Sequence, residues 1–403
     1  MKLLIITSSF PADQRIGGIW IPDLIHELNH LGCHVHVLTQ NCDRPRTEAK
    51  SLWEGCDITC FSWHGGREPL IDIVSKLTFI NFLKIAHFFL SGIITGKKIC
   101  QRWKPDFILA EWIIPGGLMA LTISVWTGIP YAVRALGSDV LVATNKSMLR
   151  PFIRLAATRA AILFADGFDL CKKTSALAGS KECHFAPTNR QLTDTRSGFA
   201  APEDAGFFRT VTVGRLHVSK GQDVLIKAVK ILVDKGIPIR SYIVGYGEEY
   251  DHYTEMIKDL KLENNVSLTG KLADGDIKAL FKHADCIVIP SRSESISLIL
   301  GEAAAEKKPV VVTDAGDTSY LVNKYHLGLS VPNEDYVAMA GAIENIITSP
   351  NRDQFTSNGE LLLSLLGTGT AALTILEKCR AYLHENKGAS IDHNLKGGNI
   401  HHE

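Results

Sequence analysis

Short runs of β-branched and other apolar residues alternate with longer helical patterns along nearly the whole chain. Strands that are apolar almost throughout are typical of parallel sheets covered by helices on both faces. We expect strands at residues 2–7, 34–39, 57–61, 107–110 and 131–134, and again at residues 210–213, 240–244, 266–268, 286–289, 310–313 and 328–331. The pattern predicts an α/β fold of two doubly wound parallel-sheet domains facing a cleft, with ligands at the carboxyl ends of the strands.

The 403 residues exceed what one hydrophobic core usually holds, so two domains are expected. The polar stretch 187–206 is interpreted as the linker between an N-terminal domain, residues 1–188, and a C-terminal domain, residues 207–366. Helices are expected at residues 21–31, within 71–103, and at 116–127, 149–164, 354–366 and 370–385. The segment 368–386 is expected to pack back on the first domain, and the polar residues 387–403 to form a disordered tail.

The charge distribution and the cysteine content indicate the cellular compartment of the protein and the kinds of partner that it can bind. Residues 1–190 hold 21 basic and 15 acidic side chains, whereas residues 191–403 hold 22 and 28, so the first half is the more basic. The nine cysteines form no C-x-x-C pair, which favours reduced thiols in the cytoplasm. The most apolar region, residues 71–94, contains Lys76 and Lys84, and its longest uncharged run falls short of the roughly 20 residues that cross a bilayer. We therefore expect no membrane span.

A loop between a predicted strand and helix carries two cations and two glycines. In "VTVGRLHVSKGQDVL" these are Gly214, Arg215, Lys220 and Gly221. Backbone N–H groups at a helix start attract an anion, Arg can hold two phosphate oxygens, and Lys adds a point charge. The loop therefore predicts a diphosphate site, with an ordinary solvated loop as the alternative.

A second stretch, "SRSESISLILGEAAAEKKPVVVTD", places Glu294 and Glu302 eight positions apart before a strand. The spacing of two glutamates alone is not specific. The pair becomes specific because this stretch follows the cationic loop in the chain. Together with Pro290, Ser291 and Pro309, the two stretches resemble the retaining glycosyltransferases of family 4, which have the type B fold of two Rossmann-like domains. The resemblance is strongest from about residue 210 to residue 347.

The resemblance implies roles for both motifs. Glu302 would accept hydrogen bonds from the ribose hydroxyls of a nucleotide-sugar donor, and Glu294 would lie near the transferred sugar. Arg215 and Lys220 would hold the diphosphate and, with Glu294, form the catalytic set. The implied donor-binding residues are Gly17, Gly18, Gly214, Gly245, Gly247, Leu272, Ile296, Ser297, Leu298 and Glu302.

The first half matches the family less closely. "ILAEWIIPGGLMAL" supplies Trp112, and "AVRALGSDVLV" supplies Gly137 and Asp139, which the resemblance places on the acceptor or sugar side. Leu136 stands where the family has a histidine. Arg134 is the alternative hydrogen-bond donor to the sugar, unless strand alternation buries its side chain. "APTNRQ" keeps only fragments of the family's hinge motif.

The implied reaction is retaining transfer of a sugar from a nucleotide-diphosphate sugar to a glycan or lipid-linked acceptor. No covalent nucleophile stands out, which fits a front-face mechanism. Neither a metal nor another cofactor is expected, because the cations serve the diphosphate, and no nucleic-acid partner is implied. Two alternatives stay open: a catalytically silent member acting as a partner or regulator, and a nucleotide-sugar 2-epimerase-like enzyme. The nucleotide, the sugar and the acceptor stay undetermined.

Residues 71–96 are rich in Ile, Leu and Phe and lie in the more basic half. With Lys76, Lys84, Lys97 and Lys98 they predict an apolar, basic surface suited to a lipid-linked acceptor at the inner face of a membrane. The alternative is a core helix with solvated lysines. We accordingly expect a cytoplasmic enzyme of cell-surface polysaccharide or lipopolysaccharide synthesis, peripheral on the inner membrane face.

Overall fold

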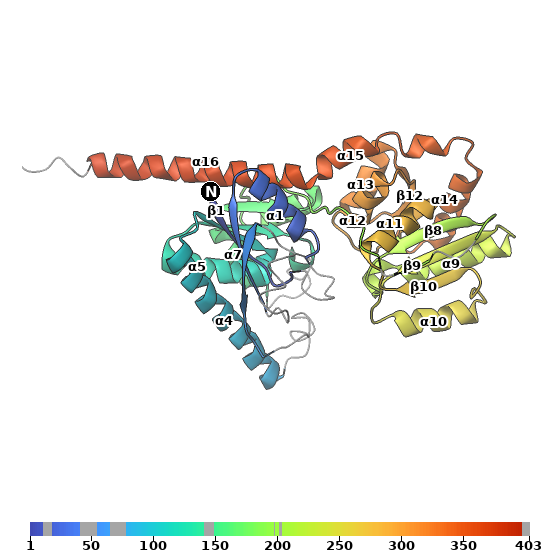
Figure 1. Cartoon of the computed structure of the whole chain (residues 1–403), viewed down its shortest axis with the longest axis horizontal. Helices are drawn as coiled ribbons and strands as arrows, with labels where there is room; N and C mark the ends of the chain where they lie inside the picture. The colour runs from blue at the N-terminus through green and yellow to red at the C-terminus, as the bar shows by residue number, and fades with distance from the viewer. Residues whose placement is uncertain are drawn as a thin grey trace, which may run out of the picture. The chain divides into compact units, whose positions relative to one another are not determined.

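The computed structural model describes residues 1–10, 18–40, 55–64, 78–140, 149–196, 198–200 and 204–396. The chain divides into two compact units. The first unit comprises Met1–Pro187 and Thr368–Glu403, and the second comprises Thr188–Gly367 (Figure 1). The chain therefore leaves the first unit once and returns to it for its last segment.

The first unit contains a seven-stranded, wholly parallel sheet in the order β3-β2-β1-β4-β5-β6-β7. Its strands are β1 (Lys2–Ile6), β2 (His34–Gln40), β3 (Cys56–Phe61), β4 (Phe107–Glu111), β5 (Tyr131–Ala135), β6 (Ile162–Ala165) and β7 (Cys183–Phe185). β1, β4, β5 and β6 are almost completely buried. This burial explains why their sequences are apolar without alternation.

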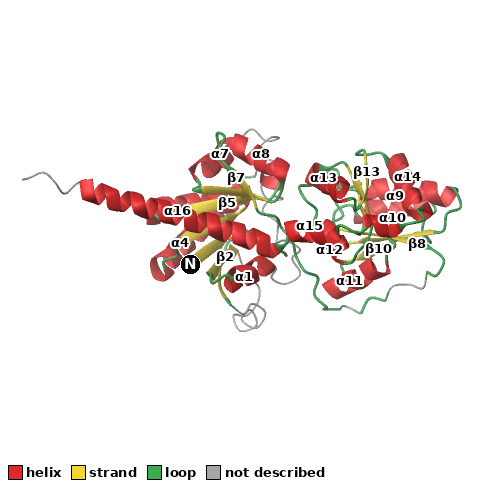
Figure 2. Cartoon of the chain, turned by 90° about the horizontal axis from the view of Figure 1, so that it is seen from above, coloured by secondary structure: helices red, strands yellow, loops and turns green. Residues whose placement is uncertain are grey.

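Helices cover both faces of this sheet. One core includes residues of α4 (Phe79–Trp103), α5 (Leu118–Thr127), α7 (Arg150–Arg159) and α8 (Phe168–Leu177). The π-helical segment η1 (Trp112–Gly117) joins β4 to α5. The other core includes residues of α1 (Ile21–His30) and α16 (Thr368–Lys396), and Figure 2 shows α16 running along the sheet.

The second unit contains a six-stranded parallel sheet in the order β10-β9-β8-β11-β12-β13. Its strands are β8 (Phe208–Val213), β9 (Ile239–Val244), β10 (Val266–Gly270), β11 (Cys286–Ile289), β12 (Val310–Thr313) and β13 (Gly328–Val331). Its helices are η2 (Val218–Lys220), α9 (Gln222–Asp234), α10 (Tyr250–Asp259), α11 (Asp274–His283), α12 (Leu298–Ala305), α13 (Gly316–Tyr325), α14 (Tyr336–Thr348), η3 (Arg352–Phe355) and α15 (Gly359–Leu366). The predicted class of two doubly wound parallel sheets is confirmed.

Three expectations about individual elements are wrong. The helix expected over residues 149–164 ends at Arg159, because its last apolar run, Ile162–Ala165, is strand β6. A short apolar run beside a helical pattern cannot be assigned by periodicity alone. Residues 188–206 belong to the second unit rather than to a separate linker. Helix α16 continues to Lys396 instead of giving way to a disordered tail at residue 387, because an established helix extends at little cost per residue.

Two stretches of the described residues are long and apolar enough to cross a membrane by length and composition, Phe79–Trp103 and Gly359–Asn386. The second stretch is broken, because α15 ends at Leu366 and α16 begins at Thr368. The first is α4, which buries a narrow stripe including Phe88 and Cys100 against the first sheet.

Candidate functional site

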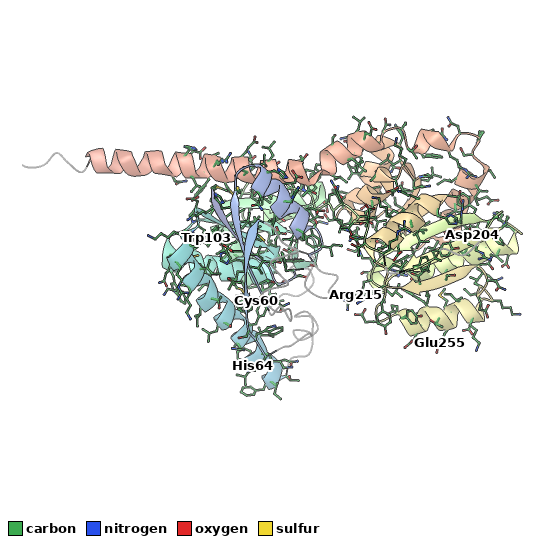
Figure 3. The ribbon with its side chains drawn as sticks, viewed as in Figure 1. Cys60, His64, Trp103, Asp204, Arg215 and Glu255 are labelled. Carbon is green, nitrogen blue, oxygen red and sulfur yellow. The ribbon has the colours of Figure 1, made fainter. Side chains whose placement is uncertain are left out.

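The motif loops of the second unit all follow the carboxyl ends of neighbouring strands. Gly214 and Arg215 follow β8, Gly245 follows β9, and Pro290 follows β11. Because β9, β8 and β11 are adjacent and parallel, these loops gather at one edge of the sheet. Figure 3 labels Arg215 near this edge, whereas Asp204, which precedes β8, lies toward the opposite end of the strands.

Lys220 and Glu294 meet at this edge. Lys220 ends η2, and its Nζ donates to Glu294 Oε2 at 2.6 Å. The Ser291 hydroxyl donates to the same oxygen at 3.1 Å. Both charged side chains are partly exposed, so a ligand can reach them. The structure thus brings together two predicted catalytic residues that lie 74 positions apart.

Arg215 pairs with Glu248, a carboxylate that the sequence analysis did not single out. The Arg215 guanidinium donates to both Glu248 oxygens, and the two side chains are about half exposed. Partial burial acts to raise the pKa of Glu248, but its own backbone N–H and the Arg215 guanidinium lower it overall. Gln222 donates to the Arg215 carbonyl at 3.1 Å, which fixes the loop to the start of α9.

Two of the predicted glycines permit a close approach of backbones. Gly245 has a φ of 141°, and a Cβ there would collide with the Gly214 carbonyl. At Gly247 a Cβ would collide with the Leu216 carbonyl. The loops after β8 and β9 can therefore lie against each other only because these positions lack side chains.

Glu302 lies on α12 and is 3% exposed. Its Oε1 accepts a hydrogen bond from Arg190 Nε at 2.6 Å. Its Oε2 is buried and accepts no hydrogen bond from the residues that the structure describes. Burial raises the pKa of Glu302, whereas the Arg190 guanidinium opposes that shift and Asp274 adds to it. A buried carboxylate with one unpaired oxygen suits a ligand that donates hydrogen bonds.

The start of α12 carries three residues of the implied donor-binding set. The Ser297 N–H already donates to the Thr318 hydroxyl at 3.0 Å. Ile296 is buried, and Leu298 and Leu272 are half-buried. Leu272, another residue of the implied donor-binding set, lies between β10 and α11.

Arg292 is a structural residue of this site that sequence reasoning missed. Its guanidinium contacts Asp223 at 2.8 Å and also Glu334, while its backbone N–H donates to the Ser219 carbonyl at 2.8 Å. These bonds hold the loop after β11 against the start of α9. Its position between Ser291 and Glu294, two residues of the second motif, was the available signal.

In the first unit, Trp112 stands at the carboxyl end of β4 with a φ of 64°. Such a conformation is unusual for a bulky residue and often marks a functional position. Its ring lies against that of Trp20, with centroids 5.6 Å apart. Gly18, in the loop before α1, also has a positive φ, whereas Gly17 lies outside the described residues.

Asp139 is buried after β5 and joins two loops. It accepts hydrogen bonds from the backbone N–H groups of Ile113, Leu136 and Val140 at 2.7, 3.3 and 3.0 Å. Burial raises the pKa of Asp139 to about 6 despite these bonds. Gly137 has a φ of 96°, which allows the turn that directs the carboxylate back toward these donors.

Arg134 does not offer its guanidinium to a sugar. The side chain is 1% exposed and donates to Glu111 at 3.2 Å, to the Ala186 carbonyl at 3.1 Å and to the Pro187 carbonyl at 2.8 Å. Because β5 is buried on both faces, strand alternation cannot bring this residue to the surface. The sugar-side role predicted for Arg134 is therefore corrected to a structural one.

Two family models match consecutive parts of the chain. "Glycosyl transferase 4-like" matches residues 19–166, and "Glycosyl transferases group 1" matches residues 196–361. The chain is 26% identical to the "Putative teichuronic acid biosynthesis glycosyltransferase TuaC" of Bacillus subtilis, over 85% of this chain and 88% of that protein. It is 29% identical to the "D-inositol 3-phosphate glycosyltransferase" of Rhodococcus erythropolis, over 66% of this chain and 60% of that protein.

Solved structures share the architecture. Sucrose-phosphate synthase from Thermosynechococcus elongatus has a TM-score of 0.76 and 17% identity, covering 96% of this chain and 100% of that one. Anabaena Alr3699/HepE, solved in complex with UDP and glucose, has a TM-score of 0.72 and 19% identity, covering 94% and 100%. With the matched family models, this fold places the chain among the group 1 glycosyltransferases, the family 4 type with two Rossmann-like domains.

Proposed function

We propose that this glycosyltransferase moves a sugar, with retention of configuration, from a nucleotide-diphosphate sugar to a glycan or lipid-linked acceptor. The observation that carries the proposal is the convergence of Arg215, Lys220 and Glu294 at the strand ends of the second sheet. Two similar proteins support it, one named as a putative teichuronic acid biosynthesis glycosyltransferase and one solved in complex with UDP-glucose. Cell-surface polysaccharide or lipopolysaccharide synthesis is the proposed setting.

In the proposed reaction the two cations stabilise the leaving diphosphate. The bond from the anomeric carbon to the phosphate oxygen breaks while the acceptor oxygen bonds to the same face of that carbon. The acceptor's proton passes to the leaving phosphate. Preorganised positive charge at a departing anion is the largest single source of catalysis in such sites, and no metal is needed in this scheme. Donor binding would exchange the present carboxylate partners of Arg215 and Lys220 for phosphate oxygens.

We propose that the Glu302 carboxylate accepts a hydrogen bond from a ribose hydroxyl of the nucleotide. Its unpaired Oε2 lies in a desolvated position, where a hydroxyl donor would satisfy it. Glu302→Ala should therefore weaken nucleotide binding by about 1.5–3 kcal/mol, as expected for a hydrogen bond to a charged group. The control is Glu263→Ala, which removes an exposed carboxylate of the same unit.

The direct experiment is calorimetry with UDP, GDP and ADP, followed by assays of nucleoside diphosphate release from the matching sugars. The proposal requires the parent to bind one nucleotide and Glu302→Ala to bind it more weakly, with Glu263→Ala unchanged. Equal affinity in all three folded proteins removes the ribose assignment.

A catalytically silent role is the second candidate, and Leu136 is the observation that favours it. It stands at the family's histidine position and is half-buried, so no imidazole reaches a sugar from that point. Donor binding without release of nucleoside diphosphate, across a panel of lipid-linked and soluble acceptors, would favour this candidate over the enzyme.

We further propose that α4 attaches the cytoplasmic enzyme to the inner membrane face, where a lipid-linked acceptor resides. Phe79 is 76% exposed, and other large apolar side chains exposed on α4 are Ile80, Phe82, Leu83, Leu90 and Ile94. Trp126 of α5 is also exposed, and Lys97 Nζ of α4 lies 4.7 Å from its ring centroid. Lys98 is exposed and Lys84 half-buried, whereas Lys76 lies outside the described residues. An apolar helix face bordered by lysines suits an anionic bilayer.

Liposome sedimentation at low salt tests this attachment, with and without anionic lipid. Phe79→Ser with Phe82→Ser should abolish binding, and Lys97→Gln with Lys98→Gln should weaken it on anionic vesicles. Phe152→Ser is the matched control, because Phe152 is an exposed aromatic residue of α7 in the same unit. If the parent stays in the supernatant, a soluble acceptor becomes the better proposal.

A further inference from the structure

The segment that enters the second unit carries a cation aimed at the proposed ribose carboxylate. Arg190 lies two residues after Thr188, where the second unit begins. Its Nε donates to Glu302 Oε1 at 2.6 Å, and its Nη1 donates to Asp274 Oδ1 at 2.9 Å. Its side chain is 11% exposed, so these contacts are largely shielded from water.

One guanidinium therefore spans two carboxylates on different helices. Asp274 opens α11, and Glu302 lies within α12. The planar fork of an arginine fixes both directions at once, which a lysine cannot do. Glu302 is consequently held at Oε1 while its Oε2 stays without a partner among the described residues.

The neighbouring residue contributes to the same arrangement. Gly301 has no side chain, and a Cβ there would stand 2.7 Å from Asn189 Oδ1. Residues 189 and 190 thus lie directly on α12. A side chain at position 301 would have to displace the Asn189 side chain from this contact.

We infer that Arg190 is a positioning residue for the donor: it holds Glu302 so that Oε2 is left to accept a ribose hydroxyl. This inference rests on the proposed function, because it assumes that the ribose of the donor binds Glu302. Arg190 itself does not touch the donor in this arrangement. Without it, the buried carboxylate would lose its counter-charge and its fixed orientation.

The test compares nucleotides that differ by one hydroxyl. Calorimetry on the full chain would use the best-bound nucleoside diphosphate and its 2′-deoxy and 3′-deoxy forms. In the parent, removal of the ribose hydroxyl that donates a hydrogen bond to Glu302 should raise the Kd of the nucleotide about tenfold or more. In Arg190→Gln the ribo form should bind about as weakly as the deoxy form. The ratio of the deoxy Kd to the ribo Kd should therefore approach one.

Two further variants separate positioning from folding. Arg190→Lys keeps the positive charge but lacks the planar guanidinium, so its ratio of deoxy to ribo Kd should lie between those of the parent and Arg190→Gln. Arg196→Gln changes an exposed arginine of the same segment and should behave as the parent does. Thermal unfolding establishes that each variant is folded.

The outcomes separate this inference from the function on which it rests. If the parent binds none of the three nucleotides, the proposed function fails and the inference falls with it. If the parent binds and discriminates, but Arg190→Gln keeps the full ratio, the inference alone is wrong. Tighter binding by Arg190→Gln would overturn it too, because Arg190 would then compete with the ribose.

Discussion

Replacing Arg134 by alanine should destabilise the first unit strongly. The change leaves the buried Glu111 carboxylate without its counter-ion and removes the donors to the carbonyls of Ala186 and Pro187. Loss of one partner of a buried ion pair costs about 3–5 kcal/mol, and each lost hydrogen bond to a carbonyl adds about 1 kcal/mol. We expect a total loss of about 5–7 kcal/mol.

Tryptophan fluorescence isolates this effect. All six tryptophans lie between residues 20 and 126, within the first unit, so urea unfolding followed by fluorescence reports on that unit alone. Arg154→Ala, an exposed arginine of α7, is the control and should stay within about 0.5 kcal/mol of the parent.

A double variant tests the electrostatic part of the reasoning. Glu111→Met with Arg134→Met replaces both charges by apolar groups, which is often neutral for a buried pair. Glu111 Oε2 already lacks a partner among the described residues, so the double variant should recover most of the lost stability. A loss below about 1 kcal/mol in Arg134→Ala, or no recovery in the double variant, would refute the argument.

Three other predictions concern the cationic loop of the second unit and Asp139 of the first unit. Arg215→Ala and Lys220→Ala should each lower kcat by about 10²–10³, more than they raise KM, because charge grows on the diphosphate in the transition state; steady-state kinetics that change only KM would contradict this. Glu248→Gln frees Arg215 from an exposed pair worth about 1 kcal/mol or less, so calorimetry should show a nucleoside diphosphate Kd lower by up to about fivefold, with Glu249→Gln as control. Asp139, with its pKa raised to about 6, stabilises the first unit most below about pH 4 and loses that contribution as the pH rises through 6. Asp139→Asn should flatten this dependence in fluorescence-monitored urea unfolding, and an unchanged slope between pH 4 and 6 would count against it.

The fold class was predictable because nearly every strand of both sheets is a continuous apolar run between helical patterns. β6 and β7 were missed for different reasons. Ile162–Ala165 continues the apolar pattern of the helix before it, and Cys183–Phe185 is a three-residue, half-buried strand at a sheet edge. Neither offers a local signal that separates it from its surroundings.

The candidate site was predictable where chemistry and strand ends coincide. Lys220 and Glu294 both lie in loops that a doubly wound sheet must bring to one edge. Arg190 was not predictable, because its contact with Glu302 spans 112 positions and its own segment looks like an ordinary polar linker. Arg134 shows the converse, since a charged residue in a short motif suggested a sugar contact, whereas its strand is buried on both faces.

The return of α16 to the first unit has a consequence for synthesis of the chain. Ala371, Ala372, Ile375, Leu376 and Cys379 belong to the same core as α1 and the strands β1 and β2. Domains usually complete in the order in which the ribosome releases them. Here the second unit, whose residues are continuous in the chain, is fully released while the first still lacks one wall of its core. The unit that is translated first is therefore the last that can finish folding, and a chain stopped before Thr368 carries an intact second unit beside an uncovered sheet.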